Sequence, residues 1–285
     1  MRASEVAHEV AERLSRSGSP SPGPEARTLV AHVLGIEPAQ LLVASVSPGQ
    51  RAVVDQLVDL RAEGAPLQHL TGVAYFRYET LEVGPGVFVP RPETEEMVTW
   101  ALKQLAARPV GRRRVVELCA GSGAITAAIG HELGQVELHA VELSPDAHAY
   151  LVRNLDGLAV DVVLGDMAEA FHELDGTVDL VIVNPPYIPE PHRQLLPADV
   201  LQDPEMALFS GRDGLDALRV VAQVATRLLR PGGLLATEHD DSHAPAVVRL
   251  FEEAGFADVT PRNDLTGRPR FVTAAAPPDD GRIGL

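Results

Sequence analysis

Cysteine and lysine are almost missing from this chain of 285 residues, which has one of each, Cys119 and Lys103. A single thiol excludes an intramolecular disulfide framework and a zinc site built from several cysteines. The formal net charge is −16 at pH 7. Proteins that grip a phosphate backbone need clustered basic side chains, so we expect no direct binding of nucleic acid.

Long apolar stretches are missing as well. The longest hydrophobic runs have the length of a strand, far short of the roughly 20 residues that span a membrane. The first residues carry acids and lack the apolar segment of a signal peptide. We therefore expect no membrane partner and a cytoplasmic location. The chain length favours a large domain with a small second one.

The first 72 residues show helical periodicity interrupted by turn signals. Val6, Val10 and Leu14 recur at helical spacing and give a first helix an apolar stripe. Further helices are predicted over residues 25–34, 38–43 and 48–63. No catalytic constellation occurs among them. We predict a helical substrate-docking domain over residues 1–72, with a purely structural cap as the alternative.

A joining segment is predicted at residues 73–93. Residues 65–72 read as linker, and the alternating residues 75–83 predict a β-hairpin between the two domains. Thr94 is a candidate cap for a helix that runs to about residue 107. The polar tail, residues 277–285, is expected to be disordered.

From residue 114 the pattern alternates between strands and helices. Strands are predicted over residues 115–118, 136–142, 160–164, 178–183, 234–238 and 270–274. Helices are predicted over residues 123–133, 145–155, 214–229 and 244–254. This alternation predicts an α/β domain over residues 94–276, with a mostly parallel sheet covered by helices on both faces. Ligands of such sheets bind at the carboxyl ends of the strands.

A loop of small residues follows the first strand and leads into a helix, with Gly121 and Gly123 in it. Glycine lets the backbone approach a ligand, and the helix amino terminus offers unpaired N–H groups, so a nucleotide or nucleoside is expected there. Glu142 ends the next strand, where a carboxylate can accept hydrogen bonds from both ribose hydroxyls. Thr126 replaces the third glycine of a dinucleotide fingerprint and no Walker A motif occurs, which disfavours NAD and ATP.

The most apolar short run, residues 178–183, ends in a tetrapeptide of Asn184, Pro185, Pro186 and Tyr187. Two prolines have fixed φ and no N–H, so the backbone is stiff, extended and rich in unpaired carbonyls. The side-chain carbonyl of Asn184, a proline carbonyl and the aromatic ring of Tyr187 could together bind a planar group that bears an NH2. The alternative is a proline-rich loop that merely closes a strand.

Glu117, which precedes the first loop, and the loop glycines Gly121 and Gly123 resemble the first motif of class I (Rossmann-like) S-adenosylmethionine-dependent methyltransferases. Asp166 matches the position that contacts adenine in those enzymes. Residues 184–187 match their fourth motif, which marks methylation of a planar exocyclic or amide nitrogen. The resemblance implies S-adenosylmethionine as cofactor. It assigns cofactor contacts to Glu117, Cys119, Ala120, Gly121, Ser122, Gly123, Glu142, Asp166, Met167 and Asn184.

Further segments narrow the resemblance to the HemK/PrmC family. They are residues 66–72, 88–95, 203–211 and 213–215. Members of that family methylate N5 of the glutamine in the Gly-Gly-Gln motif of class I peptide chain release factors, and their amino-terminal domain docks the release factor. The resemblance thus implies a protein-(glutamine-N5) methyltransferase of translation termination, with release factors as protein partners.

The residue chemistry agrees with an amide substrate. An amide nitrogen is a poor nucleophile because its lone pair is delocalised, so binding must hold it in line with the sulfonium methyl. We expect Asn184 Oδ1 and the Pro185 carbonyl to accept its N–H groups, with Tyr187 against the side-chain plane and Pro186 beside it. Alternatives are methylation of a ribosomal-protein glutamine or of an adenine or guanine amino group. A third is a non-catalytic interaction protein with a relic cofactor site.

Two positions depart from the family pattern. Cys119 stands where glycine is usual, and Met167 stands where an aromatic side chain often packs on adenine. The acidic and histidine-rich residues 238–243 suggest metal ligands, but they follow a strand. We read them as a polar loop and expect no metal site.

Overall fold

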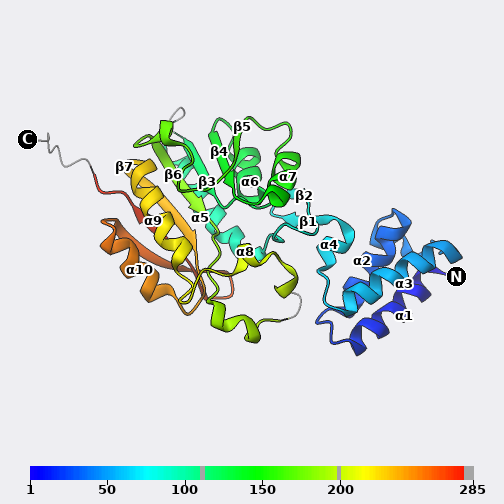
Figure 1. Cartoon of the computed structure of the whole chain (residues 1–285). Helices are drawn as coiled ribbons and strands as arrows, with labels where there is room; N and C mark the ends of the chain where they lie inside the picture. The colour runs from blue at the N-terminus through cyan, green and yellow to red at the C-terminus, as the bar shows by residue number, and fades with distance from the viewer. Residues whose placement is uncertain (110–112, 198–199, 279–285) are drawn as a thin grey trace, which may run out of the picture. The chain divides into compact units, whose positions relative to one another are not determined.

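The computed structural model describes residues 1–109, 113–197 and 200–278 (Figure 1). Two compact units are present, Met1–Val73 with Leu196–Gln202 and Ala74–Leu195 with Asp203–Leu285. The domain limits given above stay a prediction. Of the tail expected at residues 277–285, positions from 279 onward lie outside the described residues. No helix in the described part of the chain has both the length and the apolar character to cross a membrane.

The first unit is helical, as the periodicity predicts. Its elements are α1 (Ala3–Arg16), α2 (Pro22–Leu34), η1 (Pro38–Leu42), α3 (Pro48–Ala62) and α4 (Leu67–Thr71). Val6, Val10 and Leu14 are fully buried in its core. The prediction of a plain linker over residues 65–72 missed α4. This helix is only five residues long, too short for periodicity to detect, and it is held because Leu67 and Leu70 pack against the core of the unit.

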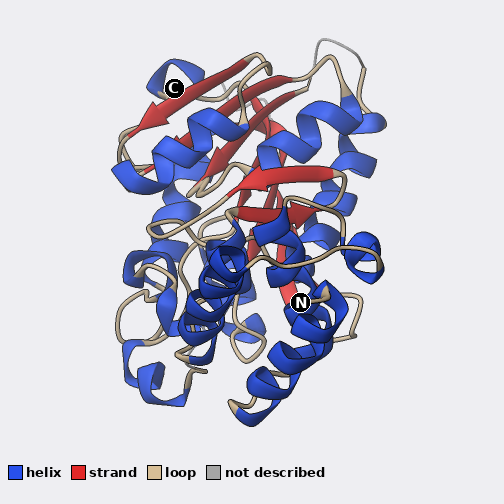
Figure 2. Ribbon diagram, turned by 90° about the vertical axis from the view of Figure 1, so that its right-hand side faces the viewer, coloured by secondary structure: helices blue, strands red, loops and turns tan. Residues whose placement is uncertain are grey.

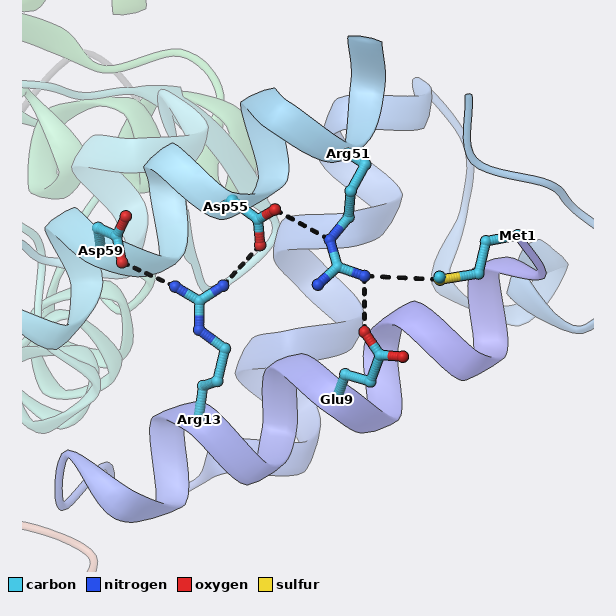
Figure 3. Close-up of polar contacts among 6 residues, drawn as sticks. All are labelled: Met1, Glu9, Arg13, Arg51, Asp55 and Asp59. Carbon is cyan, nitrogen blue, oxygen red and sulfur yellow. Dashed lines mark hydrogen bonds and ion pairs between the residues drawn. The ribbon is translucent and has the colours of Figure 1, made fainter. Parts of the chain in front are cut away.

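An ionic network ties α1 to α3 (Figure 3). Asp55 of α3 accepts hydrogen bonds from two arginines, Arg13 of α1 at 2.5 Å and Arg51 of its own helix at 3.0 Å. Arg13 also reaches Asp59 at 2.7 Å, and Arg51 reaches Glu9 at 2.6 Å. Exposed ion pairs of this kind each stabilise by less than about 1 kcal/mol, so they brace a bundle that its apolar core holds.

The predicted hairpin consists of β1 (Val73–Phe76) and β2 (Glu79–Glu82). Phe76 and Leu81 are buried in the core formed with α5 and α6. Arg77, at the turn, donates to Glu132 of α6 at 2.7 Å and to Thr99 of α5 at 2.7 Å. These contacts fasten the hairpin to the second unit.

The second unit contains a seven-stranded sheet in the order β5-β4-β3-β6-β7-β9-β8. The strands are β3 (Arg114–Leu118), β4 (Glu137–Glu142), β5 (Val160–Leu164), β6 (Val178–Val183), β7 (Leu229–Glu238), β8 (Ala257–Asn263) and β9 (Pro269–Ala275). β3 to β7 run parallel, and β9 is antiparallel to β7 and β8. The predicted α/β class is confirmed. β8 was not predicted, because Pro261 and several exposed polar residues hide its pattern.

Helices cover both faces of the sheet, which Figure 2 shows as red strands among blue helices. Leu180 and Ile182 of β6 face one core, together with α5 (Glu95–Ala106), α6 (Ala124–Leu133) and α7 (Pro145–Asn154). Val181 and Val183 face the other core, with α9 (Asp216–Leu228) and α10 (Ala244–Glu253). Short helices fill the connections: η2 (Pro92–Thr94), η3 (His172–Leu174), η4 (Glu190–Leu195), η5 (Val200–Gln202) and α8 (Glu205–Leu208).

Candidate active site

The carboxyl ends of five parallel strands lie at one edge of the sheet. Leu118, the last residue of β3, pairs with Val141 of β4 and with Val183 of β6. Val183 in turn pairs with Thr237 of β7, and Glu142 pairs with Leu164 of β5. The residues that follow these positions therefore share an edge. They are the loop 119–123, the turn at 165–167, the segment 184–187 and Glu238.

Glu117 holds the start of α6. Its side chain is buried, and Oε2 accepts hydrogen bonds from the backbone N–H of Thr126 at 2.8 Å and from the Thr126 hydroxyl. Burial raises the pKa of Glu117 to about 8, so the carboxyl group carries its proton at neutral pH. A contact with cofactor remains a prediction for this residue.

Cys119 occupies a position whose backbone favours glycine. The residue has a left-handed backbone with φ +52°, a conformation that glycine adopts without steric cost. Its Sγ lies 3.7 Å from Met167 Sδ, so the two departures from the family pattern contact each other. Burial raises the pKa of the Cys119 thiol. The thiol is therefore protonated, which disfavours a role as nucleophile, and its contact with the cofactor stays a prediction.

The two glycines of the loop have different surroundings. A Cβ at Gly123 would lie 2.7 Å from Leu151 Cδ1, so this glycine permits α7 to pack against the loop. At Gly121 the same position has no atom within 4 Å, which leaves open space beside the backbone. Ala120 is fixed by its N–H bond to the Val141 carbonyl at 3.0 Å. The carbonyl of Ser122 accepts Asn154 Nδ2 at 2.9 Å.

Glu142 is buried and bound at both carboxylate oxygens. Oε2 accepts the N–H of Gly121 at 2.8 Å, and Oε1 accepts the N–H of Ser144 at 2.7 Å. Each carboxylate oxygen has a second lone pair, so both can still accept a hydroxyl. The fixed orientation and the spare acceptors fit the two hydroxyls of a ribose.

The turn after β5 lies beside Glu142. The N–H of Gly165 donates to the Glu142 carbonyl at 2.9 Å. Asp166 is exposed, and its Oδ1 accepts the N–H of Ala168 at 2.9 Å. Met167 is partly buried against the core. An exposed carboxylate next to an apolar sulfur suits an adenine edge and face, so the set of groups fits an adenosine cofactor.

The segment 184–187 is connected to two buried side chains that the sequence did not mark as part of the site. Asn184 Nδ2 lies 3.4 Å from Thr94 Oγ1, and the Tyr187 hydroxyl donates to Glu238 Oε1 at 3.1 Å. Thr94 Oγ1 donates to Glu238 Oε2 at 2.6 Å. Thr94 was predicted to cap α5, but its side chain makes no capping bond. That prediction was wrong because Thr94, as the last residue of η2, has a helical backbone with φ −70° and ψ −21° instead of the extended backbone of a capping residue. Pro185 is buried and Pro186 half-buried.

Burial governs the ionisation of this cluster. It raises the pKa of Glu238 to about 6, against the opposing hydrogen bond from Thr94. Burial and the charge of Glu238 raise the pKa of Tyr187 well above its usual value. At neutral pH Glu238 is therefore an anion and Tyr187 a neutral hydroxyl donor.

The histidine-rich run after β7 does not form a metal site in the described residues. No group of three or more His, Cys, Asp or Glu side chains is placed there to hold an ion. His239 is buried and its Nδ1 lies 2.7 Å from the Asp240 carbonyl.

Known proteins resemble the chain over nearly its whole length. Residues 5–72 match the family model of the PrmC N-terminal domain, and residues 115–200 match a methyltransferase domain. The release factor glutamine methyltransferase of Streptomyces coelicolor is 46% identical over 92% of this chain and 94% of its own length. The enzyme of the same name from Corynebacterium glutamicum is 43% identical, over 95% and 97%.

A solved structure supports the fold alone. The hMettl16 catalytic domain in complex with the MAT2A 3'UTR hairpin 1 superimposes with a TM-score of 0.56 at 15% identity, covering 82% of each chain. The predicted methyltransferase fold, enzyme class and cofactor are confirmed by these likenesses taken together. With such identity over almost all of both sequences, the chain belongs to the release factor glutamine methyltransferase family.

Proposed function

We propose that this protein transfers the methyl group of S-adenosylmethionine to N5 of the glutamine in the Gly-Gly-Gln motif of class I peptide chain release factors. The observation that carries the proposal is the pairing of Leu118 with Val183. This register sets the loop 119–123 beside the segment 184–187. A methyl donor held by the first and a planar amide held by the second would meet at the same edge of the sheet.

The cofactor side of the site uses the residues that the sequence selects. Glu142 would accept the ribose hydroxyls of the cofactor, Asp166 and Met167 would contact its adenine, and the backbone of Gly121, Ser122 and Gly123 would border the remainder of the molecule. Glu117 and Ala120, which are buried, and Cys119, which is partly buried, complete the cofactor side of the site. When bound, S-adenosylmethionine supplies a methyl group on a positively charged sulfur, which is the electrophile of the reaction.

The substrate side holds an amide nitrogen. Asn184 Oδ1 and the Pro185 carbonyl accept its two N–H groups, while Pro186 and Tyr187 border the side-chain plane. Two acceptors favour a more tetrahedral nitrogen, whose lone pair is then available for the methyl carbon. The C–N bond forms as the C–S bond breaks, and the nitrogen then loses a proton to water. No strong base is needed, because the nitrogen becomes acidic only once it is methylated.

The helical first unit docks the release factor, a role supported by its match to the PrmC N-terminal domain. Cytoplasmic placement follows, because peptide release takes place there. With a net charge of −16 the protein is unsuited to grip nucleic acid directly.

Transfer of labelled methyl from S-adenosylmethionine tests the proposal. The substrates are a purified class I release factor, the same factor with its Gly-Gly-Gln glutamine changed to alanine, ribosomal proteins, and DNA. We expect label in the unaltered factor alone. Label in ribosomal protein or DNA, with none in the release factor, would overturn the assignment.

The segment 184–187, which we call the substrate clamp, is tested by the variant Asn184→Ala in the same assay. Loss of a fixed acceptor should lower turnover about 100-fold. Cofactor affinity, measured by calorimetry, should change much less than turnover, because every assigned cofactor contact other than Asn184 lies on another loop. Turnover equal to the wild type would remove Asn184 from the mechanism.

A further inference from the structure

We propose that Thr94 and Glu238 are positioning residues for methyl transfer, which together orient the side-chain amide of Asn184 and the ring of Tyr187. The inference rests on the proposed function of the segment 184–187. It adds two residues that do not touch the substrate themselves.

Proton counting fixes the direction of each hydrogen bond. A threonine hydroxyl has one proton, and Thr94 gives it to Glu238 over 2.6 Å. Toward Asn184, Thr94 Oγ1 is therefore only an acceptor, so it selects the NH2 group of the Asn184 amide, 3.4 Å away. The Asn184 Oδ1 must then face the opposite side. This is the atom that the substrate amide requires.

The Glu238 carboxylate is connected to both Asn184 and Tyr187 of the substrate clamp. Glu238 Oε2 accepts from Thr94, and Oε1 accepts from the Tyr187 hydroxyl at 3.1 Å. Glu238 is 1% exposed and Thr94 is 3% exposed. A carboxylate buried so deeply costs stability unless its hydrogen bonds offset the loss of hydration. Here both of those bonds lead to the substrate clamp.

The orientation depends on the charge of Glu238. Arg270 favours the anion and Glu93 opposes it, while Thr94 and Tyr187 donate to it. Once protonated, the carboxyl group must donate one hydrogen bond of its own. It can then donate to Thr94, whose proton is released toward Asn184, and either amide orientation becomes possible. Burial places this change near pH 6 by raising the pKa of Glu238.

Thr94→Val and Thr94→Ser form a matched pair that tests the inference. Valine keeps the shape and removes the hydroxyl, and serine keeps the hydroxyl. We expect Thr94→Val to lower kcat roughly 10- to 100-fold, the loss typical of a displaced catalytic group. KM for the release factor and the Kd for S-adenosylmethionine should stay close to wild type, while the melting temperature should fall because the buried Glu238 loses one hydrogen bond. Thr94→Ser should recover most of kcat.

Glu238→Gln supplies an independent readout. A neutral amide offers one acceptor and one donor, so it cannot receive both hydroxyls. Wild-type kcat should fall as pH drops through about 6. Glu238→Gln should have low kcat throughout and lack that acid limb. A side chain with only a structural role would not move the pH profile.

The outcomes separate the two proposals. Release-factor methylation by the wild type together with unchanged kcat in Thr94→Val overturns the positioning role alone. An acid limb retained in Glu238→Gln also overturns it. Absence of release-factor methylation by the wild type overturns the proposed function and the positioning role with it.

Discussion

The backbone N–H of Gly121 donates to the Glu142 carboxylate over 2.8 Å. The bond joins the loop after β3 to the end of β4, so the residue expected to accept ribose hydroxyls also orients the glycine loop. A direct hydrogen bond therefore links the two segments that we expect to hold the cofactor.

Glu142→Gln should weaken cofactor binding by about 10- to 100-fold, the effect of losing hydrogen bonds to a charged group. The new NH2 would face either Gly121 N–H or Ser144 N–H, both of which are donors. Calorimetric titration with S-adenosylmethionine measures the change. Glu253→Gln, on the exposed end of α10, is the control. Equal affinity of both variants would exclude Glu142 from the ribose contact.

Cys119→Gly should be more stable than Cys119→Ala by about 1 kcal/mol, because only glycine relieves the left-handed backbone at φ +52°. Both variants lose the sulfur contact with Met167, so the comparison isolates the backbone. Urea denaturation gives the two free energies of unfolding. A tie between the variants would mean that Cys119 stores no strain.

Glu117→Gln should flatten the pH dependence of stability. The folded-state pKa of Glu117, about 8, lies above the usual value of 4.5. Between these values the folded state holds a proton that the unfolded state has released, so rising pH destabilises the wild type. The slope for one such group is about 1.4 kcal/mol per pH unit. When the free energy of unfolding is measured from pH 5 to 8, it should fall with pH in the wild type and fall less in Glu117→Gln. Parallel curves would contradict the raised pKa.

Gly214→Ala should abolish most turnover, because its Cβ would lie 2.4 Å from the Tyr187 carbonyl oxygen. Gly255→Ala is the matched control, since Gly255 also has positive φ, +91°, but has no atom within 4 Å of that Cβ position. Both variants should lose some melting temperature. Only Gly214→Ala should lose kcat, and equal kcat in the two would show that the segment 184–187 tolerates displacement.

Where a run of residues is uniformly buried, the sequence alone predicts its strand. β6 has the predicted limits, 178–183, because every one of its residues is buried between two helical layers. β8 has no such run. It is an edge strand like β5, but β5 has a mostly apolar sequence, whereas β8 contains Pro261 and several polar residues.

Some residues of the candidate site could likewise be predicted from the sequence, and others could not. Glu142 and the segment 184–187 each end an apolar strand, so their position at the ligand edge follows from local pattern. The bond between Thr94 and Glu238 joins residues 144 positions apart. No spacing rule connects a threonine before one helix with a glutamate at the end of a distant strand. Thr94 therefore looked like a helix cap, and Glu238 like the start of a polar loop.

The distance in sequence between Thr94 and Glu238 also determines the order in which the site residues are synthesised. During synthesis the amino-terminal parts emerge first, so the glycine loop and Glu142 leave the ribosome well before Glu238 does. A chain that has not yet added β7 to its sheet carries the groups assigned to cofactor but not the carboxylate that holds Thr94 and Tyr187. By our positioning inference, such a chain would lack the orienting carboxylate even though its assigned cofactor residues are all present.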